Sequence, residues 1–335
     1  MCLHVTNLPD DVLSVIARLL AESDLASAVA LKRCSRFKDL VTRQVENVEK
    51  STDKEWRIAA AKIGARNVAT MITDGLEHNT VLTKLHLDGG HHVNTFGAVA
   101  IAQALRNNAA LKSLDMSFNY KTGYMGVAAI AEGLRGNGVL TELNLFDNTI
   151  GDRGAVAIAE TLCNNRVLTL NIGANKIGRK GATAIAEALR GDAVLKNLDI
   201  GYNDIGGEGV AAIAEVLGNA GLTELNLARN GIDDACAVAL ASALRDNGVL
   251  INLNLDRNQI SDKGAKVIGE ALIVNRKLKT LILSYNNIRD EGANAIGKAL
   301  TVNGKLKTLY LCHNDIGAES AKALASAQRG RVGPM

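Results

Sequence analysis

A nine-residue pattern of alternating leucines that ends in asparagine recurs along this chain at an almost constant interval. LTELNLFDN (140–148) and LINLNLDRN (250–258) are full copies, and degenerate or shortened copies start at Leu82 and Leu168. The closing asparagines follow one another every 27 to 29 residues: Asn119, Asn148, Asn175, Asn203, Asn230, Asn258, Asn286 and Asn314. A fixed period of this length indicates a solenoid, in which each repeat is one small structural unit.

A second pattern, rich in alanine, follows each leucine pattern at a fixed distance, as in GAVAIAETL (154–162) and GANAIGKAL (292–300). Its apolar residues are three and four positions apart, which is typical of a helix, whereas the alternating leucines are typical of a strand. Neither half can bury its apolar side alone, so neighbouring repeats must stack. We therefore expect an α/β solenoid over 81–328, a horseshoe with a parallel concave sheet and convex helices.

Position within the repeat predicts what each residue does. Strand leucines such as Leu143 and Leu145 should point inward, and the closing asparagine should bond backbone groups where the chain leaves the strand. Leu162, Leu189 and Leu217 should fill the space between the layers. Carboxylates stand at the expected helix starts, where capping and the helix dipole favour them: Asp152, Asp262 and Asp290.

These repeats resemble the ribonuclease-inhibitor-like class of leucine-rich repeats, over roughly 80–328. The resemblance implies a protein that binds another macromolecule and is not an enzyme. We find no catalytic motif such as a P-loop, HExxH or GxSxG.

The residues between the strand leucines should line the concave face. Asparagines and aspartates there have two interpretations, a solvated sheet face or a binding surface. Tyrosine and arginine are the residues that most often anchor interfaces. We therefore predict a protein-binding surface from the large side chains near the strand ends: Phe146, Tyr202, Arg229, Arg257, Tyr285, Tyr310 and His313.

The segment 1–50 differs from the repeats and reads as short helices, with 51–80 as a capping half-repeat and 329–335 as a flexible tail. Segment 1–50 resembles the F-box in the order of these residues: Leu8, Pro9, Asp11, Val12, Ile16, Leu19, Asp24, Leu25, Cys34, Ser35, Arg36, Phe37, Leu40 and Val41. The resemblance implies docking to the Skp-type adaptor of cullin–RING ubiquitin ligases, through Leu8, Pro9, Val12, Ile16, Leu25 and Phe37. The alternative is a plain helical cap.

An F-box followed by such repeats is similar to the GALA-type effectors that bacteria inject into host cells. The resemblance implies a substrate-recognition subunit in the cytoplasm, which is the host's if the protein is an effector. Two rival hypotheses are a scaffold or inhibitor of the ribonuclease-inhibitor type and, with less support, a GTPase-activating protein.

Charge and cysteine content limit the partners. The chain has 38 basic and 35 acidic residues and no long basic run, so we expect no nucleic-acid partner. No apolar run is long enough to span a bilayer, and we expect no membrane partner. The five cysteines show no paired spacing and are expected to be reduced and packed as small apolar residues. Adjacent His91 and His92 indicate a solvated loop, and we expect no metal or cofactor.

Overall fold

The computed structural model describes residues 76, 80, 83–88, 93–190 and 194–329. By their contacts the residues form two compact units, which divide within the repeats. The described residues up to Ile150, together with Asn164–Thr169, form the first unit, and those of Gly151–Cys163 and from Leu170 onward form the second. The predicted F-box-like segment and most of the capping half-repeat therefore lie outside the described residues.

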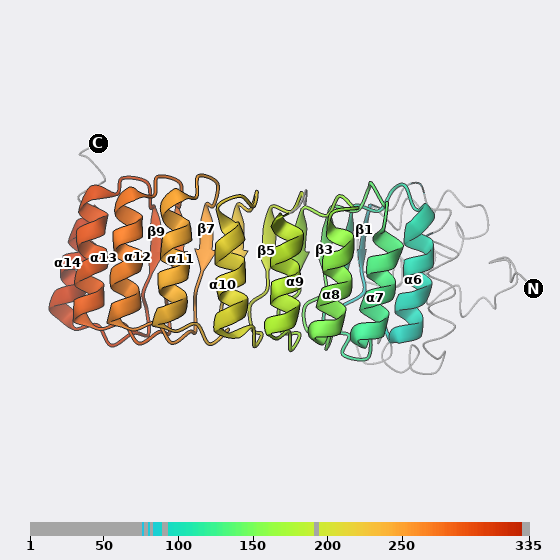
Figure 1. Ribbon diagram of the computed structural model, residues 1–335, viewed down its shortest axis with the longest axis horizontal. Coiled ribbons are helices and arrows are strands. Elements are labelled where there is room, and N and C mark those ends of the chain that lie inside the picture. Colours follow the sequence, from blue (N-terminus) through green and yellow to red (C-terminus); the bar gives the residue numbers. More distant parts are fainter. Residues whose placement is uncertain (1–75, 77–79, 81–82, 89–92, 191–193, 330–335) are drawn as a thin grey trace, which may run out of the picture. The chain divides into compact units, whose positions relative to one another are not determined.

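The first unit alternates strands and helices in the predicted order (Figure 1). Its elements are β1 (Lys84–His86), α6 (Thr95–Asn107), β2 (Ser113–Asp115), α7 (Gly123–Leu134) and β3 (Glu142–Asn144). The strands pair in parallel with the central leucines Leu85, Leu114 and Leu143 in register. Leu76, just before β1 in this unit, is buried, and its carbonyl accepts a hydrogen bond from Asn108 at 2.7 Å.

The second unit continues the same alternation. Its helices are α8 (Gly151–Leu162), α9 (Arg179–Arg190), α10 (Gly206–Leu217), α11 (Asp234–Asp246), α12 (Asp262–Val274), α13 (Asp290–Val302) and α14 (Ala318–Arg329). Its strands are β4 (Thr169–Asn171), β5 (Asn197–Asp199), β6 (Glu224–Asn226), β7 (Asn252–Asn254), β8 (Thr280–Ile282) and β9 (Thr308–Tyr310). From β5 to β9 each strand pairs in parallel with the next in the chain.

The core lies between the strands and the helices, as predicted. Leu143 and Leu145 are buried, and so are the helix leucines Leu162, Leu189 and Leu217. Glycine at the start of the alanine-rich pattern lets neighbouring helices approach closely. A β carbon on Gly264 of α12 would lie 3.0 Å from the β carbon of Ala237 in α11. That distance is shorter than an ordinary contact, so a larger residue at Gly264 would force neighbouring atoms to shift.

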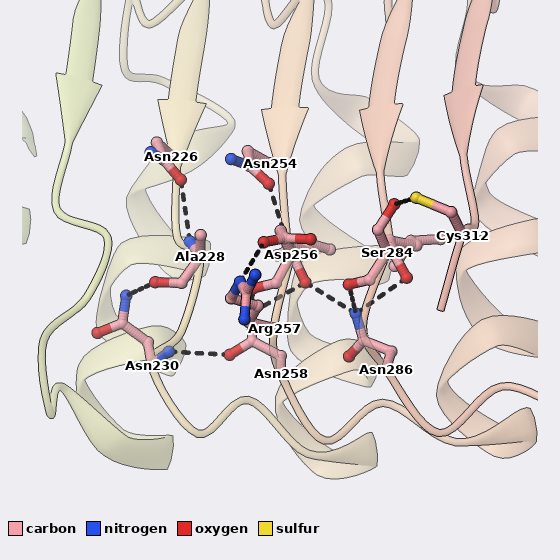
Figure 2. Close-up of polar contacts among 12 residues, drawn as sticks. Asn226, Ala228, Asn230, Asn254, Asp256, Arg257, Asn258, Ser284, Asn286 and Cys312 are labelled. Atoms are coloured by element: carbon pink, nitrogen blue, oxygen red, sulfur yellow. Dashed lines mark hydrogen bonds and ion pairs between the residues drawn. The ribbon is translucent and has the colours of Figure 1, made fainter. Parts of the chain in front are cut away.

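The recurring asparagines bond the backbone of two repeats at once, which confirms the prediction for this position. Asn258 donates to carbonyl oxygens of Leu227, Leu255 and Asp256 at 3.0–3.1 Å. Its side-chain oxygen accepts from the amide of Asn230 (Figure 2) and from that of Ile232. Buried backbone groups that a short strand leaves unpaired are satisfied in this way.

The aspartates lie in the first turn of their helices, as predicted, and the structure adds that their carboxylates bond the start of the next helix. Oδ1 of Asp152 in α8 accepts hydrogen bonds from the amides of Gly178 and Gly181, at the start of α9. Asp290 likewise accepts from the amide of Gly317, at the start of the following repeat's helix. Each carboxylate therefore satisfies the free amides of the next helix in the stack.

A second row of asparagines, which the sequence analysis did not single out, ends the helices. Asn275 donates to the carbonyl of Leu244 at 2.7 Å and accepts from the amides of Lys277 and Leu278. The same arrangement recurs at the other buried members of this row: Asn108, Asn137, Asn247 and Asn303. These residues fix the loops that connect helices to strands.

The cysteine prediction holds for only part of the described chain. Cys236 occupies the repeat position that Gly264 has in the next helix, and it is buried. Cys163 and Cys312 are exposed free cysteines. For the last two, packing as small apolar residues is wrong. None of the helices that the structure describes is long and apolar enough to cross a membrane.

Candidate functional site

One face of the sheet in the second unit is covered by helices, and the other carries no helix of this unit (Figures 1 and 2). Side chains alternate along each strand, so Leu281 is buried against the helices and Ile282 faces the other way. We call this uncovered side the open face. It is the surface on which the sequence places a binding site.

In both units, the asparagines and aspartates at the strand ends have a structural role. Each side-chain oxygen accepts a hydrogen bond from the backbone amide two residues later, at 2.9–3.1 Å, in Asp115, Asn144, Asn171, Asp199, Asn226 and Asn254. The series therefore stabilises the turn after each strand. It stops in the last two repeats, where Ile282 and Tyr310 occupy the same register.

The residue just before each recurring asparagine has a left-handed backbone. Its φ lies between 50° and 58° in Phe118, Asp147, Ala174, Tyr202, Arg229, Arg257, Tyr285 and His313. Glycine adopts this conformation without strain, whereas other residues pay for it. Because Asp147 and Ala174 share this backbone, it belongs to the turn after the strand, and the bulky side chains placed on it are candidates for a functional role.

Five of these side chains form a row along the second unit, which we call the aromatic–arginine row: Tyr202, Arg229, Arg257, Tyr285 and His313. The rings of Tyr285 and His313 stack with centroids 4.0 Å apart and planes 14° apart. The Arg257 guanidinium also packs against Tyr285 and lies 4.1 Å from the centroid of its ring. Arg229 lies 5.8 Å from the ring of Tyr202.

The charge of the row is predominantly positive. Asp256 is its ionic partner, with Oδ2 3.4 Å from Nε of Arg257. Burial raises the pKa of the Asp256 carboxyl, and the positive charges of Arg257 and His313 act in the opposite direction. Among the described residues Asp256 is the carboxylate in ionic contact with the row, which itself carries two arginines and a histidine, so the row favours an acidic ligand.

The structure brings together most of the predicted surface. Tyr202, Arg229, Arg257, Tyr285 and His313 form the row, and Tyr310 is half exposed at the end of β9. Phe146 belongs to the first unit, where its ring packs edge-on against Phe118 with centroids 5.3 Å apart. Phe118, 51% exposed, was not predicted as a site residue. Its place in the same repeat position as Tyr202 was the signal that could have identified it.

The predicted adaptor-binding residues and the histidine loop lie outside the described residues. The first group comprises Leu8, Pro9, Val12, Ile16, Leu25 and Phe37, and the second comprises His91 and His92. Within the described ranges, no group of three histidines, cysteines or acidic residues could hold a metal ion.

Seven segments of the chain match the family model described as Leucine Rich repeat: 136–159, 164–186, 193–214, 218–241, 249–269, 274–297 and 302–325. No curated protein matches the chain.

Solved structures with similar folds include an internalin from Listeria monocytogenes, 18% identical, with a TM-score of 0.42 over 80% of this chain and 93% of that one. The C-terminal domain of Caenorhabditis elegans tropomodulin is 16% identical, with a TM-score of 0.39 over 45% and 92% of the two chains. A chain of a TLR13–ssRNA13 complex is 19% identical, with a TM-score of 0.46 over 74% and 35%. The seven matched segments coincide with the strand–helix units, so the repeats of this chain are leucine-rich repeats that build an α/β solenoid.

Proposed function

We propose that this chain is a recognition subunit without enzymatic activity, which holds a protein ligand on the open face of its second unit. Leucine-rich-repeat proteins generally act in protein–protein interaction. The observation that carries the proposal is the contact between Arg257, Tyr285 and His313, stacked in one exposed row.

The stacking supports binding because it orders the side chains before a ligand arrives. Flexible side chains lose about 0.5–1.5 kcal/mol each when an interface immobilises them. Arg257 and Tyr285 already lie against each other, so part of this cost is met in the free protein. Their residue types are also those that most often dominate interface energies.

We further propose that the N-terminal segment is an F-box that docks a Skp-type adaptor, which makes the chain the substrate receptor of a cullin–RING ubiquitin ligase. The support is the F-box-like order of residues from Leu8 to Val41, placed before a repeat region built for recognition. On this proposal the chain works in the cytoplasm, and in the host cytoplasm if it is a bacterial effector.

The adaptor proposal is tested by co-purification of the full chain with a purified Skp-type adaptor. We expect a complex, and we expect Leu8→Ala/Pro9→Ala to abolish it. Arg179→Ala/Arg190→Ala, on an exposed helix face, is the control and should leave the complex intact. No adaptor binding by the intact chain would exclude the ligase role and favour a scaffold or inhibitor.

The open-face proposal is tested on a protein, other than the Skp-type adaptor, that the full chain binds. Arg257→Ala/Tyr285→Ala should weaken that binding by at least about 30-fold, the effect of losing one strong anchor. The same Arg179→Ala/Arg190→Ala control should bind as the parent does. Unchanged affinity of the Arg257→Ala/Tyr285→Ala protein would rule the row out as the binding surface.

A further inference from the structure

The last two loops between helix and strand in the second unit differ from the earlier ones. They carry five exposed cations, which we call the basic rim: Arg276, Lys277, Lys279, Lys305 and Lys307. Between Leu272 and Tyr310 the carboxylates are Asp290 and Glu291, which stand at the start of α13, the opposite end of that helix from these loops. The rim is therefore a local excess of positive charge on a chain whose formal net charge is only +3.

Exposed aliphatic side chains lie beside the rim at the ends of the same two helices. Val274 and Val302, the last residues of α12 and α13, are 56% and 54% exposed, and Ile273 is 39% exposed. In earlier repeats the position of Val274 and Val302 holds asparagine, aspartate or glycine, as at Asn107, Gly136 and Asp246. In the last two of these loops, aliphatic side chains at the helix end thus stand beside a pair of lysines.

Hydrogen bonds hold the two loops in a fixed arrangement. Oδ1 of Asn275 accepts from the amides of Lys277 and Leu278, and Asn303 does the same for Lys305 and Leu306. Arg276 donates from Nη1 to the carbonyl of Val302 at 3.4 Å, which links one loop to the next. The cations and the aliphatic residues are therefore presented together.

We propose that this rim docks on the surface of an anionic phospholipid membrane. Lysine and arginine beside an anionic bilayer contribute electrostatic attraction, and neighbouring aliphatic side chains can enter the headgroup region. The association is peripheral. The expectation of no membrane partner was based on the lack of a spanning segment, which a peripheral contact does not need.

The bonding of the loops favours a lipid surface over an acidic peptide. The backbone amides of Lys277, Lys279, Lys305 and Lys307 are already paired within the protein, so a peptide could not add main-chain hydrogen bonds to them. Phosphate headgroups need only the side-chain cations. The rim also has no aromatic ring on which nucleic-acid bases could stack.

The test is co-sedimentation of the full-length protein with two kinds of vesicle, phosphatidylcholine alone and phosphatidylcholine with phosphatidylserine. We expect binding only to the second kind, weakening as salt is raised. Lys277→Glu/Lys305→Glu should reduce this binding by at least about tenfold, since each cation near an anionic surface contributes appreciably. Val274→Ser/Val302→Ser should remove the part of the binding that resists salt.

The matched control is Lys263→Glu/Lys266→Glu, which makes the same charge change at two exposed lysines near the start of α12. It should bind as the parent does. Equal binding to both kinds of vesicle, or an equal loss in the control, would overturn the proposal, as would binding of a nucleic-acid or acidic-peptide probe without vesicle binding. Circular dichroism checks folding, and Lys277→Gln/Lys305→Gln replaces the double glutamate variant if that variant unfolds.

Discussion

Oδ1 of Asp262, in the first turn of α12, accepts a hydrogen bond of 2.8 Å from the amide of Gly292, in the first turn of α13. The same oxygen accepts from the amide of Arg289, also at 2.8 Å. Asp234 bonds the start of α12 in the same way, through the amides of Ser261 and Gly264. The amino end of one helix thus depends on a side chain from the repeat before it.

Removing that carboxylate should destabilise the second unit. We expect Asp262→Ala to lower the free energy of unfolding by about 1–2 kcal/mol, the usual loss for a helix cap. Asp246→Ala, at the exposed end of α11, should change it by less than about 0.5 kcal/mol. Urea denaturation followed by circular dichroism measures both. Equal effects of the two substitutions would contradict the capping role.

Two glycines on neighbouring helices should respond to alanine in opposite directions. A β carbon on Gly264 would lie 2.6 Å from Oδ1 of Asp234, so Gly264→Ala should destabilise by about 1–3 kcal/mol through overpacking. A β carbon on Gly297 would meet Leu324 at an ordinary 3.5 Å. Gly297→Ala should therefore stabilise by up to about 1 kcal/mol, because alanine is the better helix former. Thermal unfolding compares the two.

Two equivalent asparagines should differ in what their loss costs. Asn258 donates to three carbonyls and accepts from two amides, whereas Oδ1 of buried Asn230 has no hydrogen-bond partner within the described residues. Asn258→Ala should lower the free energy of unfolding by about 2–4 kcal/mol, because it leaves buried polar groups without hydrogen-bond partners. For Asn230→Ala, the loss in the free energy of unfolding should be smaller by at least about 1 kcal/mol. Urea unfolding tests the order, and a larger loss at Asn230 would refute it.

Acid should weaken the start of α11. Hydrogen bonds from Cys236 hold the pKa of the Asp233 carboxyl below its ordinary value of 3.8. A lowered folded-state pKa gives stability that is full above the unfolded pKa and is lost as pH falls through the folded one. Asparagine accepts the same bond without titrating. The stability difference between the parent and Asp233→Asn should therefore shrink from pH 5 to pH 2 in urea titrations, and a constant difference would count against this contact.

Relieving a left-handed backbone should stabilise the protein where the side chain has no role. Ala174 has a φ of 55°, and we expect Ala174→Gly to raise the free energy of unfolding by up to about 1 kcal/mol. Ala243→Gly, inside α11, is the control and should lower it by about 1 kcal/mol. Differential scanning calorimetry distinguishes the two, and destabilisation by both would show that the strain is negligible.

The sequence predicted the strand–helix repeat because two hydrophobic periods alternate along it, and the buried Leu143 and Leu162 follow directly from those periods. It did not predict the partner of Asp262. Which amide a carboxylate reaches depends on the spacing between stacked repeats, which no single repeat encodes.

The candidate surface was predicted by residue type, but its geometry was not. Tyrosine and arginine have no strong preference for a left-handed backbone, so nothing in Arg257 or Tyr285 indicates the turn that aligns them. The F-box-like residues such as Pro9 and Phe37 lie outside the described residues, and their role stays a prediction.

The hydrogen bonds that join the repeats connect residues 25 to 32 positions apart, and those of Asn258 to Ile232 and Leu227 span 26 and 31. Each bond therefore needs only the adjacent repeat and nothing beyond it. Excision or duplication of one whole period, such as 231–258, would bring equivalent donors and acceptors to the new junction, whereas removal of half a period would leave both sides unmatched. One repeat is therefore the smallest segment whose removal or addition would leave these hydrogen bonds matched.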